Sequence, residues 1–273
     1  MSKENEKLLF DFLNTPLDSG DKIFERFAAI PEAISGKGEK PLERYVYIPG
    51  TRKDRIVLVA HIDTIWDKNY NMSFSDEREV ELKDGLFCSN NENCGIGADD
   101  RAGCAMLWKL KDCGHSILIT DGEEHGKFGA RHLKKSNKKL FNELNKHCFM
   151  IEFDWISTDC CLFNQVDNTE KFKNYIEKST GFIDSKLPGG TDLQILCRRI
   201  CGVNLGVGYF RQHSNGEVLS LSRWEKTYEK ISEFLQKPQK RFRSKFLPPY
   251  TRIIKGYAKK ILSIIKIKPN QKG

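Results

Sequence analysis

The segment Gly95-Ile-Gly-Ala-Asp-Asp-Arg-Ala-Gly103 places two adjacent acids between glycines, directly before an apolar run at residues 104–110. Glycine lets the backbone turn where other residues are hindered, and the run is typical of a buried helix. We therefore expect Asp99 and Asp100 on a tight turn at a helix N-terminus. Acids there cap free N–H groups and complement the helix dipole, so the pair is either a helix cap or part of a metal site.

Apolar segments of strand length lie on both sides of this stretch, at residues 55–60, 115–120, 148–153 and 202–207. Helical patterns alternate with them, from residue 104, from about 128, over 168–179, from 192 through 201 and over 221–236. Before them, 4–15 and 20–30 have helical periodicity, 45–48 is typical of a strand and 78–88 of a hairpin. Continuous apolar strands alternating with helices predict an α/β protein with a mainly parallel sheet.

Each of these four strands is followed by side chains that can bind a metal: His61, then Glu123 and Glu124, then Asp154, and after a short loop His213. Open α/β sheets bind ligands at the carboxyl ends of their strands. One such residue alone is typical of a turn or a cap. Their joint occurrence with Asp99 indicates a metal site.

The spacing within two of these groups supports that interpretation. His61 and Asp63 are two residues apart, so an extended chain puts both side chains on one face, as in a metal-bound imidazole and the carboxylate that orients it. Glu123 and Glu124 are neighbours flanked by glycines, which allow the backbone to turn both toward one cavity. Paired carboxylates raise a pKa, and a divalent cation removes that penalty.

As a set, the motifs resemble those of the dizinc exopeptidase superfamily, which includes peptidase T, single-domain leucyl aminopeptidases, tetrahedral aminopeptidases and carboxypeptidase G-like hydrolases. The matching pieces are His-Ile-Asp-Thr at 61–64, Gly-Ala-Asp-Asp-Arg-Ala-Gly at 97–103, Gly-Glu-Glu at 122–124, Asp154, Gly-Gly-Thr-Asp at 189–192 and His-Ser-Asn-Gly-Glu at 213–217. They occur in the family's order. The resemblance implies a three-layer α/β/α sandwich with a mainly parallel central sheet, in one catalytic domain over residues 1–236.

The resemblance also implies a role for each matching residue. The implied ligands of two divalent ions are Asp99 as the bridge, His61 with Asp154 at one ion, and Glu124 with His213 at the other. Zinc suits such imidazole and carboxylate donors, and cobalt and manganese are alternatives. Glu123 is the implied general acid/base toward a metal-activated water, and Asp63 orients His61. A cis peptide bond is implied between Asp99 and Asp100.

Two spacings distinguish this chain from parts of the family. Asp154 and Asp192 are only 38 positions apart, so we expect no lid domain of the kind that two-domain relatives carry there. His61 and Asp99 are also 38 apart, which is enough for a hairpin but not for the β domain of tetrahedral relatives. The spacing of the motifs is similar to that of single-domain aminopeptidases, although the residues within the motifs are closer to those of peptidase T.

By family position, Thr191, Asp192 and Arg211 are expected to contact the substrate. Asp192 is equally well explained as the N-cap of the helix that follows it. Glu217, four residues after His213, either orients that ligand or is a solvated turn acid.

Composition describes an ordinary globular chain of 273 residues, 39% apolar and 30% charged. No apolar run approaches the roughly 18 residues of a membrane span. Nine scattered cysteines without a framework spacing, and an N-terminus without a secretory pattern, favour a cytoplasmic protein.

The net charge of +8 is concentrated in a C-terminal tail at residues 237–273, which has twelve Lys/Arg and no acid. The first 236 residues carry 33 basic and 37 acidic residues. Apolar residues of the tail recur at helical spacing: Tyr250, Ile253, Ile254, Tyr257, Ile261, Ile264 and Ile265. The pattern predicts a basic amphipathic helix that packs on the body, binds an acidic partner or lies on an anionic membrane. We expect no specific nucleic-acid recognition, because no groove-reading motif is present.

The leading hypothesis is a dinuclear zinc hydrolase that cleaves a peptide or related amide bond, as an aminopeptidase. The first alternative is a carboxypeptidase-type or N-acyl amino-acid amidohydrolase, with a peptide or acyl-amino-acid substrate. The second is a non-catalytic binding protein on this fold that acts through its basic tail. All five expected ligands and Glu123 are present, which argues against a loss of catalysis.

Overall fold

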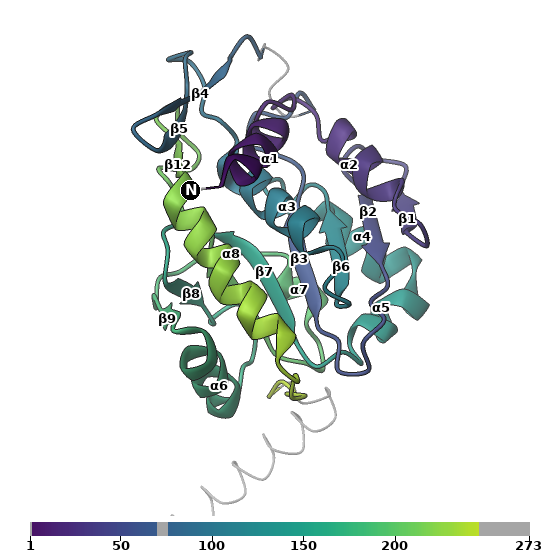
Figure 1. The fold of residues 1–273 in the computed structure, drawn as a ribbon. Coiled ribbons are helices and arrows are strands. Elements are labelled where there is room, and N and C mark those ends of the chain that lie inside the picture. Colours follow the sequence, from purple (N-terminus) through teal and green to yellow (C-terminus); the bar gives the residue numbers. More distant parts are fainter. Residues whose placement is uncertain (1, 70–75, 246–273) are drawn as a thin grey trace, which may run out of the picture.

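The computed structural model describes residues 2–69 and 76–245 (Figure 1). An eight-stranded sheet has the order β1-β2-β6-β3-β7-β10-β8-β9. Its inner strands are mutually parallel: β6 (Ser116–Thr120), β3 (Val57–His61), β7 (Met150–Trp155) and β10 (Gly202–Gly206). Antiparallel pairs extend it at both sides through β2 (Arg44–Ile48), β1 (Ile34–Lys37) and β8 (Cys160–Leu162), and β9 (Ile183–Asp184) pairs parallel to β8. The predicted α/β class with a mainly parallel sheet is confirmed.

Alternate residues of the inner strands enter two separate cores, as the period of a strand requires. In β3, Leu58 and Ala60 pack in the larger core, and Val57 and Val59 in the smaller one. The helices of the larger core are α1 (Lys3–Leu13), α2 (Asp21–Ala28), α3 (Ala98–Leu110), α6 (Glu170–Thr180) and α8 (Leu221–Gln236). Those of the smaller core are α4 (Phe128–Ser136), α5 (Lys138–Leu144) and α7 (Leu193–Leu196), beyond the sheet in Figure 1. The predicted three-layer sandwich is confirmed.

A second, four-stranded sheet has the order β11-β12-β5-β4. The predicted hairpin forms its β4 (Val80–Lys83) and β5 (Leu86–Ser89), with a turn at Asp84 and Gly85, both at positive φ. β5 pairs with β12 (Val218–Ser220), which pairs with β11 (Tyr209–Phe210). The hairpin that follows His61 in the chain is therefore bound to the segment that carries His213.

The helix expected from residue 192 through 201 is wrong in length, because α7 ends at Leu196. The side chain of Asn145 replaces the next helical turn. Its amide oxygen accepts hydrogen bonds from the N–H groups of Arg198 and Arg199, and its nitrogen donates to the carbonyl of Leu196. Side-chain bonds to backbone compete with helix propagation in this way.

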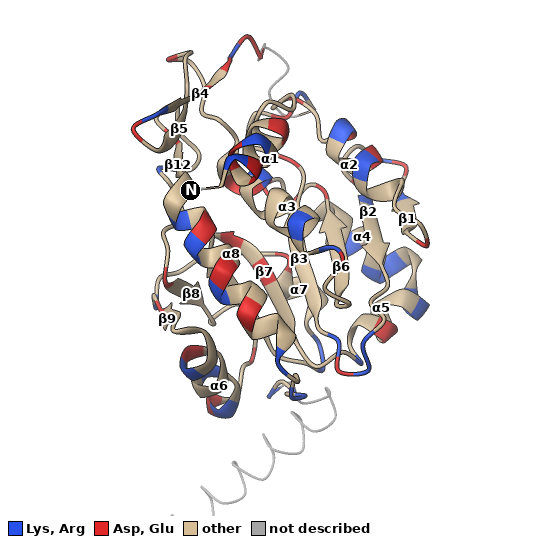
Figure 2. Ribbon diagram, in the orientation of Figure 1, with Lys and Arg blue, Asp and Glu red and all other residues tan. Residues whose placement is uncertain are grey.

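Between Asp154 and Asp192 the described chain forms β8, α6 and β9, which join the main sheet or pack against α8 rather than forming a separate domain. None of the helices in residues 2–69 and 76–245 is long and apolar enough to cross a membrane. Acidic and basic residues alternate along α8 (Figure 2).

The start of the basic tail packs on the body. The Phe242 N–H donates to the carbonyl of Cys148, and the Phe242 carbonyl accepts from the N–H of Cys201, at the amino ends of β7 and β10. The Phe242 ring lies 4.9 Å from that of Tyr175. The amphipathic helix predicted over 250–265 lies outside the described residues.

Candidate metal centre

The expected ligands gather at the carboxyl edge of the parallel strands. They are His61 at the end of β3, Glu124 just after β6, Asp154 near the end of β7, Asp99 at the start of α3, and His213 in the loop between β11 and β12. Parallel neighbours end on the same edge, so residues distant in sequence meet there.

Asp99 is at the centre of this group. Its Oδ1 lies 3.1 Å from Nε2 of His61, and its Oδ2 lies 3.1 Å from Nε2 of His213. The same nitrogen of His61 is 3.5 Å from Oδ1 of Asp154, and that of His213 is 2.7 Å from Oε1 of Glu124. The arrangement consists of two donor sets that share one carboxylate.

The electrostatics of the site fit divalent cations. Burial, with a contribution from Asp99, raises the pKa of Glu124 to about 7, and the same two causes raise the pKa of Asp154. Hydrogen bonds to Asp99 and Glu124 raise the pKa of His213 to about 10. Burial alone lowers the pKa of His61, but hydrogen bonds to Asp154, Asp63 and Asp99 outweigh it and raise that pKa. Burial thus makes the charged forms of Glu124 and Asp154 costly, and a divalent cation would remove that cost. Imidazole and carboxylate donors of this kind suit zinc.

The peptide bond between Asp99 and Asp100 is cis, as expected. Asp100 also belongs to a group of potential donors with His61 and Asp154. Its oxygens are already used, however: Oδ1 accepts from the Gly103 N–H at 2.9 Å and Oδ2 from the His61 N–H at 3.2 Å. The helix-cap role therefore holds for Asp100, which also ties α3 to β3.

Asp63 joins two parts of the site. Its Oδ1 lies 3.2 Å from Nδ1 of His61, the imidazole that it was expected to orient. The same carboxylate accepts the N–H of Glu123 at 3.0 Å and that of Glu124 at 3.1 Å. Asp63 therefore also fixes the backbone of the two glutamates, which accounts for how both reach one cavity.

Comparison with solved structures identifies peptidases of the same architecture. A tripeptidase from Staphylococcus aureus matches with a TM-score of 0.62 and 14% identity, covering 85% of this chain and 97% of its own. Aminopeptidase PepT from Bacillus cereus matches with 0.59 and 14%, covering 85% and 98%. The TET1 peptidase from Pyrococcus horikoshii matches with 0.57 and 14%, covering 85% and 98%. The chain has the three-layer α/β/α fold of these structures. No protein-family model and no curated protein matches the sequence significantly.

Glu217 holds the loop that carries Asp99, the central acid of the candidate site. Its Oε2 accepts from the N–H groups of Ile96 at 3.1 Å and Gly97 at 2.6 Å, and its Oε1 from that of Asp99 at 3.0 Å. Glu217 is 3% exposed, and burial raises the pKa of its carboxyl to about 7. Glu217 is therefore not a solvated acid, and it contacts the loop of Asp99 rather than the imidazole of His213.

Tyr209 is a site residue that the sequence did not reveal. It is buried, and its hydroxyl donates to Oδ1 of Asp154 at 3.1 Å. Its position in an apolar segment gives it the pattern of a core aromatic. Only the pairing of β11 beside the site brings its hydroxyl to Asp154, one of the expected ligands.

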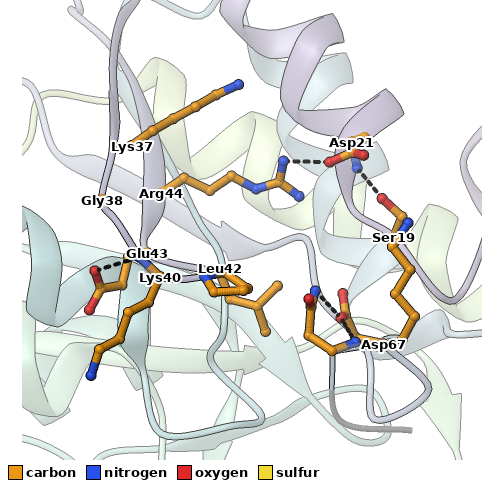
Figure 3. A pocket seen from close by; sticks show the side chains of 12 residues that line it. Ser19, Asp21, Lys37, Gly38, Lys40, Leu42, Glu43, Arg44 and Asp67 are labelled. Atoms are coloured by element: carbon orange, nitrogen blue, oxygen red, sulfur yellow. Dashed lines mark hydrogen bonds and ion pairs between the residues drawn. The ribbon is translucent and has the colours of Figure 1, made fainter. Parts of the chain in front are cut away.

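The loop of the two glutamates begins at Asp121, whose buried side chain pairs with Arg44 of β2. Arg44 also pairs with Asp21 at the start of α2, across a surface pocket of about 220 Å³ (Figure 3). In this pocket the amino groups of Lys37 and Lys40 point in opposite directions. Arg44 therefore connects β2 and α2 to the start of the loop that carries the two glutamates. The amino groups of Lys37 and Lys40 do not converge on one point, so they do not form a joint positively charged site in this pocket.

A cavity of about 210 Å³ opens beside the expected ligands. Its walls include the acids Asp99, Glu123, Glu124 and Asp154, the apolar Trp155, Ile156, Pro188 and Tyr209, and Gly189, Gly190, Thr191, Gln212 and His213. Of the three expected substrate contacts, only Thr191 is in this wall. Asp192 is fully buried at the N-cap position of α7 without a capping bond, and Arg211 is exposed.

Glu123 lies in the wall of this cavity and is 6% exposed. Burial raises its pKa, while the charges of His61 and Lys127 oppose that shift. Its Oε1 lies 2.8 Å from Nζ of Lys127, in an ion pair that the sequence did not suggest.

Proposed function

We propose that the chain is a dinuclear metal hydrolase that cleaves a peptide or related amide bond, with zinc as its metal and aminopeptidase activity as the first expectation. The position of Asp99 supports this most strongly, because its two oxygens each lie 3.1 Å from a different imidazole. A helix cap needs no such partners. The fold shared with known peptidases points in the same direction.

Two donor sets would hold the metals. His61 and Asp154 belong to one, Glu124 and His213 to the other, and Asp99 to both. Two bound divalent ions supply Lewis acidity, which lowers the pKa of water and polarises a carbonyl. Cobalt and manganese accept the same donors.

Glu123 is the proposed general base. Its N–H is fixed by Asp63, its side chain faces the cavity, and burial raises its pKa toward the range in which a base works best near neutral pH. Glu123 takes a proton from the attacking water and returns it to the leaving amine as the C–N bond breaks, while the water oxygen stays on the acyl carbon. Such a base contributes about 10²–10⁴-fold.

The Glu123→Gln variant tests this assignment, because the amide keeps the shape of the side chain and cannot take the proton. We expect about 10²–10⁴-fold slower hydrolysis of amino-acyl amides, with the metal content of the wild type, near two ions per chain. Glu229→Gln, on the exposed face of α8, is the matched control and should behave as wild type. A fully active Glu123→Gln protein would refute the mechanism, and a chain that binds no metal would refute the dinuclear site.

A further inference from the structure

Lys127 reaches the proposed base from outside the set of expected ligands. It occupies the N-cap position of α4 at φ 61°, directly after Gly126 at φ 113°. In this conformation the side chain folds back along the chain, so that Nζ lies 2.8 Å from Oε1 of Glu123. The Lys127 side chain is 16% exposed, so its charge is largely shielded from water.

The ammonium of Lys127 lies close to one residue of the cavity wall. A Cβ added to Gly190, a residue of the cavity wall, would be 3.4 Å from Nζ. No lysine or arginine is among the wall residues in the part of the chain that the structure describes. Lys127 is not itself a wall residue, but it places a positive charge beside the acid-lined wall, next to the one acid proposed to act on the leaving group.

Pairing with Glu123 as its counter-ion does not by itself explain the position of Lys127. An ammonium 2.8 Å from Oε1 of Glu123 stabilises the charged carboxylate and so opposes the proton uptake that a general base needs. Glu152 and Asp192, both fully buried, also attract the ammonium, so its position does not depend on Glu123 alone. A cation held in this way is available to an anionic group of the substrate.

The chemistry of the leaving group indicates which anion that is. When Glu123 protonates the leaving amine, that nitrogen lies against the Glu123 carboxylate. In a dipeptide or an N-acyl amino acid, the amine belongs to an amino acid whose α-carboxylate is one carbon away. Longer peptides and the C-terminal amides of dipeptides have a neutral amide at that place.

We propose that Lys127 binds the α-carboxylate of the leaving amino acid and so selects dipeptides and N-acyl amino acids over longer peptides and dipeptide C-terminal amides. This inference rests on the proposed function and specifies its substrate class. Lys127 acts here as a specificity residue, through an ion pair that only these substrates offer.

The test compares a dipeptide, its C-terminal amide and an N-acetyl amino acid as substrates of the metal-loaded full chain. The wild type should prefer the dipeptide to its amide, and Lys127→Met should reduce this ratio of kcat/KM values by about 10- to 100-fold, mainly through KM. Lys127→Arg should retain most of the preference. Lys135→Met, an exposed position on the same helix, is the matched control and should leave the ratio unchanged.

Calorimetry provides a second measurement that does not depend on turnover. The free amino acid product should bind the metal-loaded wild type more tightly than its amide, and Lys127→Met should remove this difference. Equal kcat/KM for dipeptide and amide in the wild type, or a ratio unchanged by Lys127→Met, would overturn the inference alone. A wild type that hydrolyses none of the three substrates would overturn the proposed function and the inference with it.

Discussion

The two ends of the parallel strands both contain histidines, in opposite electrostatic settings. At the carboxyl edge, His61 and His213 face carboxylates, which raise the pKa of both imidazoles. At the amino edge, His115 and His147 face backbone groups and a hydroxyl, and burial lowers their pKa values, that of His147 to about 4. Burial by itself makes an imidazole neutral. Converging acids are what distinguish the candidate site.

At the amino edge, the polar groups of Ser116 and His147 form hydrogen bonds with each other and with neighbouring protein groups. Ser116 Oγ lies 2.9 Å from Nε2 of His147 and 3.1 Å from the Tyr47 hydroxyl, and it accepts the Gly50 N–H at 2.9 Å. A serine beside a histidine can serve as a nucleophile, but here no acid orients the imidazole, because its Nδ1 contacts the carbonyl of Glu143. The contrast shows that residue types alone do not define a site. A site is defined by carboxylates that lie together and face a cavity without enough positive charge to balance them.

The largest expected effect comes from removing the shared acid at the carboxyl edge. Asp99→Asn takes charge from both donor sets at once, so metal affinity should fall by more than the about 10- to 100-fold typical of residues that only orient ligands, and hydrolysis should be lost. Calorimetric metal titration measures this. Asp112→Asn, in the turn after α3, is the control. Two tightly bound ions in Asp99→Asn would contradict the bridging role.

The next effect is at the amino edge and concerns stability. Burial lowers the folded-state pKa of His147 to about 4, below the ordinary histidine value of 6.5, so the unfolded chain binds the proton first. The contribution of His147 to stability is complete above pH 6.5 and is lost as the pH falls toward 4, by up to about 3 kcal/mol. Urea unfolding at several pH values measures it, with His147→Gln as the comparison. An equally steep loss of stability in His147→Gln would exclude this cause.

A smaller effect is expected for Glu217, because it contacts the backbone around Asp99 rather than a metal. Glu217→Gln keeps the shape but loses the charge that accepts three N–H groups, so metal affinity should fall by about 10- to 100-fold while the fold remains. Glu225→Gln is matched to it, since Glu225 accepts hydrogen bonds from Ser2 and Asn5 at the surface. Unchanged metal affinity in Glu217→Gln would show that the 95–99 loop holds its shape without this bond.

The sequence was sufficient to predict the layers and to bring five expected ligands together, because parallel strands deliver the residues that follow them to one edge. The sequence did not predict contacts in which one of the two residues comes from the second sheet. Glu217 reaches residues 96–99 only because β12 pairs with β5, and Tyr209 meets Asp154 only through β11. The premature end of α7 depends on the amide of Asn145, some fifty residues earlier. Contacts between residues far apart in the sequence produce no periodic pattern within any short stretch, so sequence periodicity cannot predict them.

The bond between Glu217 and the loop of Asp99 has a consequence for synthesis of the chain. Domains fold as they are made from the N-terminus. His61, Asp99 and Asp154 all leave the ribosome well before His213 and Glu217. A nascent chain that has passed Asp154 therefore contains every residue of one proposed donor set. The other set still lacks its imidazole, and Glu217 is not yet present to hold the loop of Asp99. The last fifth of the described chain completes the proposed hydrolase, so an unfinished polypeptide has no working centre with which to attack the peptides around it.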